Sequence, residues 1–150
     1  MNVLRSLAIV ACLAASSLAN AADGLLVLKS PHSAKDTMKR FEDAVRKRGL
    51  NVFARIDHAA GAAKAGKTLR PTEVIIFGNP EGGTPFMECA QTVGIDLPLK
   101  ALVWEDASFQ VWLGYNDPGF LGQRHGVPQC AVIENLRKAL AGIAEAAVAR

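Results

Sequence analysis

Apolar and charged residues alternate with helical spacing over one segment near the start of the chain. Four apolar residues recur there on one face: Ala34, Met38, Phe41 and Val45. Such spacing predicts an amphipathic helix, because residues three or four positions apart lie on the same side. Ser33 precedes the segment as an N-cap, with Asp36 at the third helical position as in a capping box. Gly49 follows as the residue that ends the helix.

Five other segments have the composition of β-strands. They span residues 24–29, 50–57, 72–77, 99–105 and 109–115. The third is nearly unbroken apolar, as expected of a central strand that is covered on both faces. In the fourth, side chains alternate between the two faces, so Lys100 and Trp104 share one face and Ala101 lies on the other.

Shorter helices are predicted between the strands, at residues 59–65, from Thr84 and after Asn116. In the last two, a capping residue stands shortly before a proline, which suits the first turn of a helix. A final helix over residues 129–147 has its apolar residues at helical spacing: Ile133, Leu136, Leu140, Ile143 and Ala147. This order of elements predicts an α+β domain with a mostly antiparallel five-stranded sheet and two long helices on one face.

The opposite face of the predicted sheet would hold two tryptophans, Trp104 and Trp112. Large aromatic side chains left in water form an apolar patch of the kind that marks a contact between proteins. Either the short helices between the strands or a second copy of the chain covers this face, and we expect a homodimer.

The first 21 residues have the three parts of a secretory signal peptide. Arg5 is their only charge, an apolar run covers residues 6–19, and small residues lead to a cleavage point after Ala21. The run is short for a membrane span, so we expect a cleaved signal and a periplasmic or secreted single domain of residues 22–150. The alternative is a lipoprotein cleavage box that ends at Cys12, which would leave a still shorter apolar stretch.

Charge argues against some classes of partner. The chain has 17 basic and 14 acidic residues, and loss of Arg5 leaves 16 against 14, a net charge of +2. The one basic run, Arg46-Lys47-Arg48, falls at the end of the first predicted helix, where cations complement the helix dipole. A nucleic-acid-binding protein needs a clustered basic face. We therefore expect no nucleic-acid partner and, after signal cleavage, no membrane span.

Two cysteines, Cys89 and Cys130, remain after cleavage. In an oxidising compartment they form either a disulfide, which would close a loop of about forty residues, or two separate buried thiols. No CxxC or CxxCH motif is present, which argues against thioredoxin-like chemistry and covalent haem attachment.

Asp57 and His58 end the second predicted strand and have two interpretations. In the first, Asp57 orients the imidazole, and His58 acts as a general base or a ligand. In the second, Asp57 caps the helix that begins near His58. His125, which follows Arg124, is a further candidate base. The catalytic residues are therefore left open, with His58, Asp57 and His125 as candidates.

Five polar residues near the ends of predicted strands are candidates for binding a small ligand: Asn79, Thr84, Asn116, Arg124 and Lys100. The free backbone N–H groups at capped helix starts, together with a guanidinium, suit an anion. Structural roles are the alternative. Arg124 would then pair with Asp117 on the surface, and Lys100 would either line a pocket or extend to the sheet edge.

The connections between the predicted strands decide whether the candidate site residues lie at the same edge of the sheet. If strands two to five form an up-and-down meander, strands three and five end at the same edge of the sheet, and Asp57-His58 lies at the opposite edge near Arg70 and Asp106. If residues 59–70 make a crossover instead, the strand-to-helix junctions at Asp57-His58, Thr84-Pro85 and Asn116-Asp117-Pro118 can share one edge. The sequence leaves both connections open.

The three histidines, His32, His58 and His125, are separated by 26 and 67 residues. These spacings match no local metal-binding motif, so we expect no metal site. No GxSxG, P-loop or Rossmann fingerprint is present either. The cofactor is unknown.

Four segments resemble the domain of unknown function 302 family: GLNVFARIDHAAGAAKAG, LRPTEVIIFGNP, GTPFMECAQTVGIDLPLKALVWED and VWLGYNDPGFLGQRHG. The resemblance runs from about Gly24 to Gly126 and covers nearly the whole chain after the signal peptide. It implies a TATA-binding-protein-like β-α-β4-α arrangement, which agrees with the number of predicted strands. It also implies homodimers. It implies no particular activity, and Cys89 and Cys130 are not part of the family pattern.

Three functions are compatible with these features. The first is an exported, homodimeric domain that binds a small anionic or redox-related ligand. The second is a hydrolase or isomerase that uses His58 or His125 as its general base. The third is a structural partner module whose interface contains Trp104 and Trp112.

Overall fold

The computed structural model describes residues 22–150. The predicted signal peptide and the alternative cleavage box at Cys12 lie outside the described residues. The elements follow one another as β1 (Leu25–Ser30), α1 (Ala34–Lys47), β2 (Asn51–Asp57), α2 (His58–Lys64), β3 (Thr72–Gly78), α3 (Pro80–Cys89), the 3-10 helix η1 (Gln91–Ile95), β4 (Leu99–Glu105), β5 (Val111–Asn116), α4 (Pro118–Arg124) and α5 (Val132–Val148). None of the helices described between residues 22 and 150 is long and apolar enough to span a membrane.

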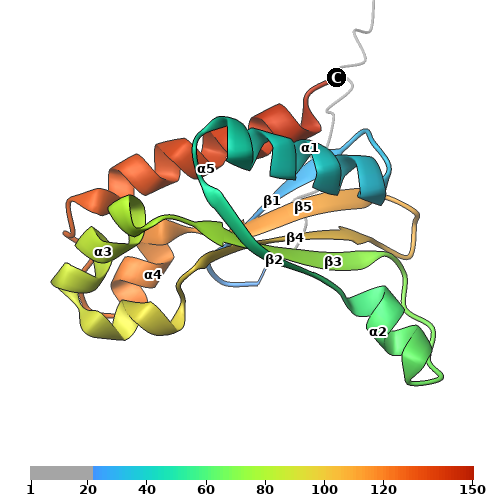
Figure 1. Cartoon of the computed structure of the whole chain (residues 1–150), viewed down its shortest axis with the longest axis horizontal. Coiled ribbons are helices and arrows are strands. Elements are labelled where there is room, and N and C mark those ends of the chain that lie inside the picture. Colours follow the sequence, from blue (N-terminus) through green and yellow to red (C-terminus); the bar gives the residue numbers. More distant parts are fainter. Residues whose placement is uncertain (1–21) are drawn as a thin grey trace, which may run out of the picture.

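The five strands form one antiparallel sheet in the order β1-β5-β4-β3-β2 (Figure 1). Strands β2 to β5 make the up-and-down meander, and β1 joins its far edge by pairing with β5. Helices α1 and α5 lie side by side over one face of the sheet. The predicted α+β fold is thus confirmed. The meander also means that β3 and β5 end at one edge, while β2 ends at the other.

Helix α1 begins and ends as its sequence predicts. The backbone N–H of Asp36 donates to Oγ of Ser33 at 3.1 Å, and the Ser33 hydroxyl donates to the Asp36 carboxylate at 2.7 Å. At the other end, Gly49 has φ +73°. Its N–H donates to the carbonyl of Arg46, and the N–H of Leu50 donates to the carbonyl of Val45. These paired bonds form a Schellman motif, which needs a left-handed residue where glycine stands.

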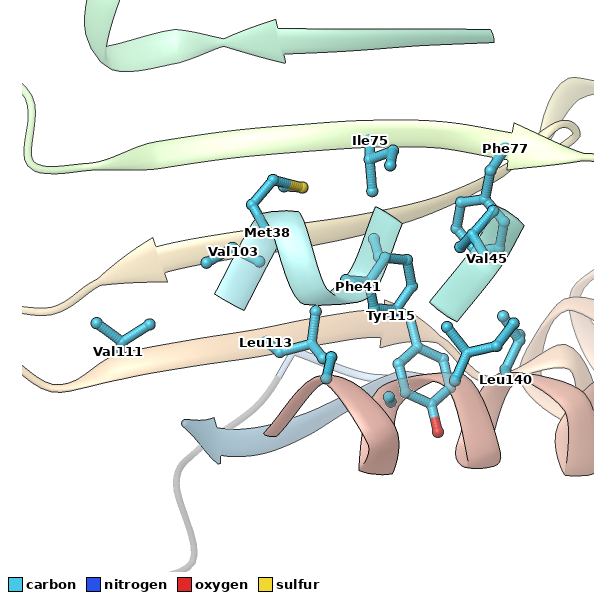
Figure 2. Packing of buried hydrophobic residues seen from close by; sticks show 14 residues of the cluster. Met38, Phe41, Val45, Ile75, Phe77, Val103, Val111, Leu113, Tyr115 and Leu140 are labelled. Carbon is cyan, nitrogen blue, oxygen red and sulfur yellow. The ribbon is translucent and has the colours of Figure 1, made fainter. Parts of the chain in front are cut away.

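The main core lies between the two long helices and the sheet (Figure 2). Phe41 of α1 meets Phe77 of β3 edge to face, with ring centroids 5.3 Å apart, and both side chains are fully buried. Edge-to-face pairs of this kind add to the stability that burial itself supplies. The remaining labelled members come from both helices and three strands: Met38, Val45, Ile75, Val103, Val111, Leu113, Tyr115 and Leu140.

A second, smaller core lies at one end of the sheet. This core lies between α3, η1, α4 and the start of α5. We call these elements together the lobe (left in Figure 1). Its buried residues are Phe86, Val93, Leu121, Cys130 and Ile133. A disulfide joins Cys89, the last residue of α3, to Cys130 just before α5. This confirms the first of the two interpretations of these cysteines.

The face of the sheet opposite α1 and α5, which we call the open face, carries Trp104 and Trp112. They are direct cross-strand partners, and both are half-buried. The indole N–H of Trp112 donates to the Asp106 carboxylate at 2.7 Å, and this bond is the main reason that the pKa of Asp106 is lowered. In Figure 1, none of the helices of residues 22–150 runs along the middle of this face.

The predicted starts of three elements are wrong. The last helix begins at Val132 and not at residue 129. Helix α3 begins at Pro80 with Asn79 as its N-cap, so Thr84 lies inside the helix and does not cap it. The fifth strand begins at Val111 because Phe109 is part of the preceding turn, where its φ of +62° does not fit a strand.

Candidate functional site

A cavity of about 650 Å³ lies between α3, α5 and the edge of the sheet where β2 and β4 begin and β3 ends. Much of its wall is apolar and comes from α3, α5, β2 and the segments before β2 and β4: Leu50, Phe53, Met87, Leu97, Leu136 and Leu140. Gly82 and Gly83 of α3 also line it, and their missing side chains leave room beside the helix. Among the described residues of the lining, Glu81 is the only charged one.

Two predicted ligand-binding residues lie at this cavity. Asn79 ends β3 and caps α3, where its Oδ1 accepts a hydrogen bond from the N–H of Gly82 at 2.9 Å. Thr84 lines the cavity from the middle of α3, on an exposed position. This bond fixes the start of α3 at the cavity wall.

A polar cluster lies on another side of the lobe, where α4 ends against η1. Asp96 accepts one hydrogen bond from Nη1 of Arg124 at 3.0 Å, and its other oxygen lies 2.7 Å from Nε2 of His125. Nδ1 of His125 lies 3.0 Å from the hydroxyl of Thr92. The His125 and Asp96 side chains are 8% and 12% exposed. We call Thr92, Asp96, Arg124 and His125 the Asp96 cluster.

Lys100 is tied to the same region through the backbone. Its Nζ donates to the carbonyls of Asp96 and Pro98, at 3.2 Å and 3.0 Å. Lys100 therefore extends to the sheet edge, the second of its two predicted positions, and is not among the residues that line the cavity.

Asp117 has a partner that the sequence did not indicate. Its carboxylate caps α4 by accepting from the N–H of Gly119 at 3.0 Å, and it also accepts two hydrogen bonds of 2.7 Å from Arg137 of α5. The bonds from Arg137 are the main cause of the lowered pKa of Asp117. The predicted surface pair between Asp117 and Arg124 is wrong, because Arg124 binds Asp96. Asn116, the last residue of β5, is exposed.

Asp57 and His58 lie at the opposite edge of the sheet. Oδ1 of Asp57 accepts from the N–H of Ala60 at 2.9 Å and caps α2, as the second interpretation predicts. His58 is exposed at the first position of that helix. The hydrogen bonds found among residues 22–150 include none between the two side chains. Asp57 therefore does not orient the imidazole of His58, as the first interpretation requires.

The structure thus divides the predicted ligand-binding residues. Asn79 and Thr84 lie at the cavity, Arg124 and Lys100 are both bound to Asp96, and Asn116 lies at an exposed strand end. Sequence reasoning missed Thr92 and Asp96 altogether. Both stand in the QTVGID stretch of a family-like segment, and the polar residues among its apolar neighbours were the available signal.

The described part of the chain contains no group of three or more His, Cys, Asp or Glu residues able to hold a metal ion. His32 has a different partner: its Nε2 lies 2.7 Å from the carbonyl oxygen of Ala149.

Comparisons with known proteins give the chain a family. The family described as "Domain of unknown function DUF302" matches residues 26–143. A crystal structure of an uncharacterized conserved DUF302 protein from Bacillus stearothermophilus superposes with a TM-score of 0.76, covering 84% of this chain and 99% of that one. At 18% identity, this likeness concerns the fold.

Among curated proteins, the chain is similar to the fluoride-specific ion channel FluC 1 of Brucella suis and FluC 2 of Brucella melitensis. Both are 51% identical over 104 residues, which is 69% of this chain. The matched segment covers 41% and 38% of those proteins, so the similarity concerns about two fifths of their length. Together with the antiparallel sheet and the match over residues 26–143, this evidence establishes that the chain belongs to the DUF302 family.

Proposed function

We propose that this chain is an exported domain that binds a small, mainly apolar ligand in the cavity between α3 and α5. The observation that carries the proposal is the cavity itself. Its volume of about 650 Å³ lies within the range of about 300–1,000 Å³ typical of small-molecule sites. Apolar side chains and glycines dominate its wall, with a few polar groups such as Asn79 at hand to orient a ligand.

The chemistry of the lining favours an apolar ligand over the anion that the helix starts suggested. The described lining residues include no cation, and their one charge is the carboxylate of Glu81. Arg124, the guanidinium that was expected to bind the anion, is paired with Asp96. An anion in the cavity would meet a negative charge and lose hydration without a compensating partner.

Binding of the neutral fluorescent probe N-phenyl-1-naphthylamine tests the proposal. A Cβ at Gly83 would lie 3.5 Å from Leu97, so Gly83→Leu fills the cavity, whereas a Cβ at Gly61 of α2 meets nothing within 4 Å. We expect Gly83→Leu to weaken probe binding at least about tenfold, the effect of about 1.4 kcal/mol. The matched control Gly61→Leu should bind like the unaltered protein. Equal affinity of both variants for the probe would show that the cavity is not the binding site.

We propose further that a second copy of the chain covers the open face. The face presents a cross-strand pair of half-buried tryptophans, Trp104 and Trp112, and a twofold contact would place the same patch on both copies. Sedimentation of Trp104→Lys should then show a monomer. The control is Phe109→Lys, in the turn before β5. Phe109 is an aromatic residue that is 72% exposed, and its change should leave the dimer intact.

Export is tested by N-terminal sequencing of the protein from the periplasm of a bacterial host. We expect the chain to start at Ala22. A chain that keeps Met1, or that begins at Cys12, would reject cleavage after Ala21.

A partner module is the second candidate function. The relatives named as fluoride-specific ion channels are matched over about two fifths of their length, which indicates that a domain of this kind is joined there to further sequence. A membrane channel is therefore a candidate partner of the open face. Co-purification with a fluoride channel of the same organism, lost in Trp104→Lys and kept in Phe109→Lys, would favour this function over the homodimer.

A further inference from the structure

The Asp96 cluster contains an ordered series of three side chains that the cavity does not use. The Thr92 hydroxyl lies 3.0 Å from Nδ1 of His125, and Nε2 of the same ring lies 2.7 Å from Oδ2 of Asp96. Asp96 and His125 are almost buried, whereas Thr92 is exposed. The series therefore runs from a buried carboxylate, through an imidazole, to a hydroxyl that a molecule in solution can reach.

The hydrogen bonds define which nitrogen acts as the base. A carboxylate only accepts hydrogen bonds, so Nε2 is the nitrogen that donates to Asp96; in the corresponding neutral tautomer, Nδ1 accepts from the Thr92 hydroxyl. Arg124 holds the other carboxylate oxygen at 3.0 Å and so fixes the orientation of Asp96. A hydroxyl next to a base that a third group orients is the general arrangement of an activated nucleophile.

We propose that Thr92, His125 and Asp96 form a catalytic group that hydrolyses small carboxylic esters, an activity separate from ligand binding in the cavity. Thr92 is the nucleophile, His125 the general base and acid, and Asp96 the residue that positions the imidazole. Because Thr92 lies at the surface and not inside a deep pocket, the substrate class is an ester with a small acyl group and a good leaving alcohol.

The reaction balances with water as the only co-reactant. Oγ1 of Thr92 forms a bond to the ester carbonyl carbon while its proton passes to Nδ1 of His125. The bond between that carbon and the alcohol oxygen then breaks, and the departing oxygen takes the proton from Nδ1. A water molecule next gives a proton to Nδ1 and attacks the acyl-threonine. Cleavage of the acyl–Oγ1 bond returns the proton to Thr92 and releases the acid.

The test uses the disulfide-bonded chain of residues 22–150 and p-nitrophenyl acetate as the probe. We expect release of p-nitrophenol and, in protein quenched early, an acetyl group on the peptide that contains Thr92. Thr92→Val, which keeps the shape and removes the hydroxyl, should lower the rate about 100-fold, as should His125→Gln. Thr92→Ser should keep most of the rate, and His58→Gln, which changes an exposed histidine elsewhere, should have no effect.

Each outcome decides the proposal. Wild-type activity in Thr92→Val, or acetyl transfer to residues other than Thr92, would overturn it. If His125→Gln does not fold, the acetylation site in the unaltered protein and the Thr92→Val rate still give the answer. Thr92→Val should bind N-phenyl-1-naphthylamine normally, so that failure of the esterase and failure of the cavity as a ligand site can be told apart.

Discussion

The sheet with its two long helices and the lobe of α3, η1 and α4 are held together by different means. Among the described residues, the main core contains fourteen buried hydrophobic residues, and the core of the lobe contains five. The lobe adds a disulfide, the pair between Asp117 and Arg137, and the Asp96 cluster. The sheet body has polar links as well, such as those from Arg55 to Glu42 of α1 and to Glu73 of β3. The lobe therefore differs in its smaller apolar core and in its disulfide. Both the cavity and the Asp96 cluster lie in or beside the lobe.

The largest effect is expected in the main core. Phe77→Ala removes a fully buried ring and its edge-to-face contact with Phe41, and should lower the free energy of unfolding by about 3–5 kcal/mol. Ile76→Ala changes the adjacent half-buried residue on the open face and is the control, with a clearly smaller loss. Urea unfolding followed by circular dichroism measures both. Similar losses would mean that the two faces of the sheet are equally packed.

Removal of the disulfide should act mainly on the lobe. The bond spans 41 residues, so the double change Cys89→Ser and Cys130→Ser should cost about 3–4 kcal/mol in the chain-entropy estimate. Amide hydrogen exchange would locate the loss. We expect faster exchange in α3 and α4 before any change in β3 and β4. Exchange that rises equally in all these elements would show that the lobe and the sheet unfold as one unit.

The pair between Asp117 and Arg137 links α4 to α5. Asp117→Ala removes both the cap and the ion pair and should cost about 1–3 kcal/mol, whereas Asp117→Asn keeps a capping oxygen and should cost less. Because hydrogen bonds from Arg137 lower the pKa of Asp117 below its usual value of 3.8, the contribution of the charge is complete above that value. It is lost as the pH falls through the lower, folded-state pKa.

Thermal unfolding between acidic and neutral pH checks this sign. The deficit of Asp117→Asn against the unaltered protein should be largest near neutral pH and should shrink in strong acid. A deficit that grows as the pH falls would contradict the assignment of the stabilising form to the carboxylate.

The sequence predicted those parts of the fold that local patterns determine. The cap of α1 at Ser33, its end at Gly49 and the alternating faces of β4 depend on neighbours in the chain, and all are confirmed. The start of α3 was wrong because two cap-and-proline pairs, Asn79-Pro80 and Thr84-Pro85, fit the same rule. In the structure the first pair starts the helix, and Oδ1 of Asn79 accepts from the N–H of Gly82.

The candidate site was harder to predict because it depends on distant segments. Asp57 and His58 are adjacent in sequence, yet Asp57 caps a helix and His58 is exposed. Asp96 and His125 are 29 residues apart, yet they lie 2.7 Å from each other. Adjacent residues at a strand end point in different directions, whereas packing of η1 against α4 brings the second pair together. Contacts of this kind have no local pattern.

The smallest effect is expected at Asp57, which belongs to neither core. Asp57→Ala removes the acceptor of the Ala60 N–H and should lower the free energy of unfolding by about 1 kcal/mol, a typical loss for an N-cap. His58→Ala should cost less, because the exposed imidazole caps nothing and alanine is the better helix former. Urea unfolding of the two variants and of Asp57→Asn, which keeps a capping oxygen, separates a cap from a reactive pair. If His58→Ala were as costly as Asp57→Ala, the two side chains would act together, and the interpretation of Asp57 as a cap would be wrong.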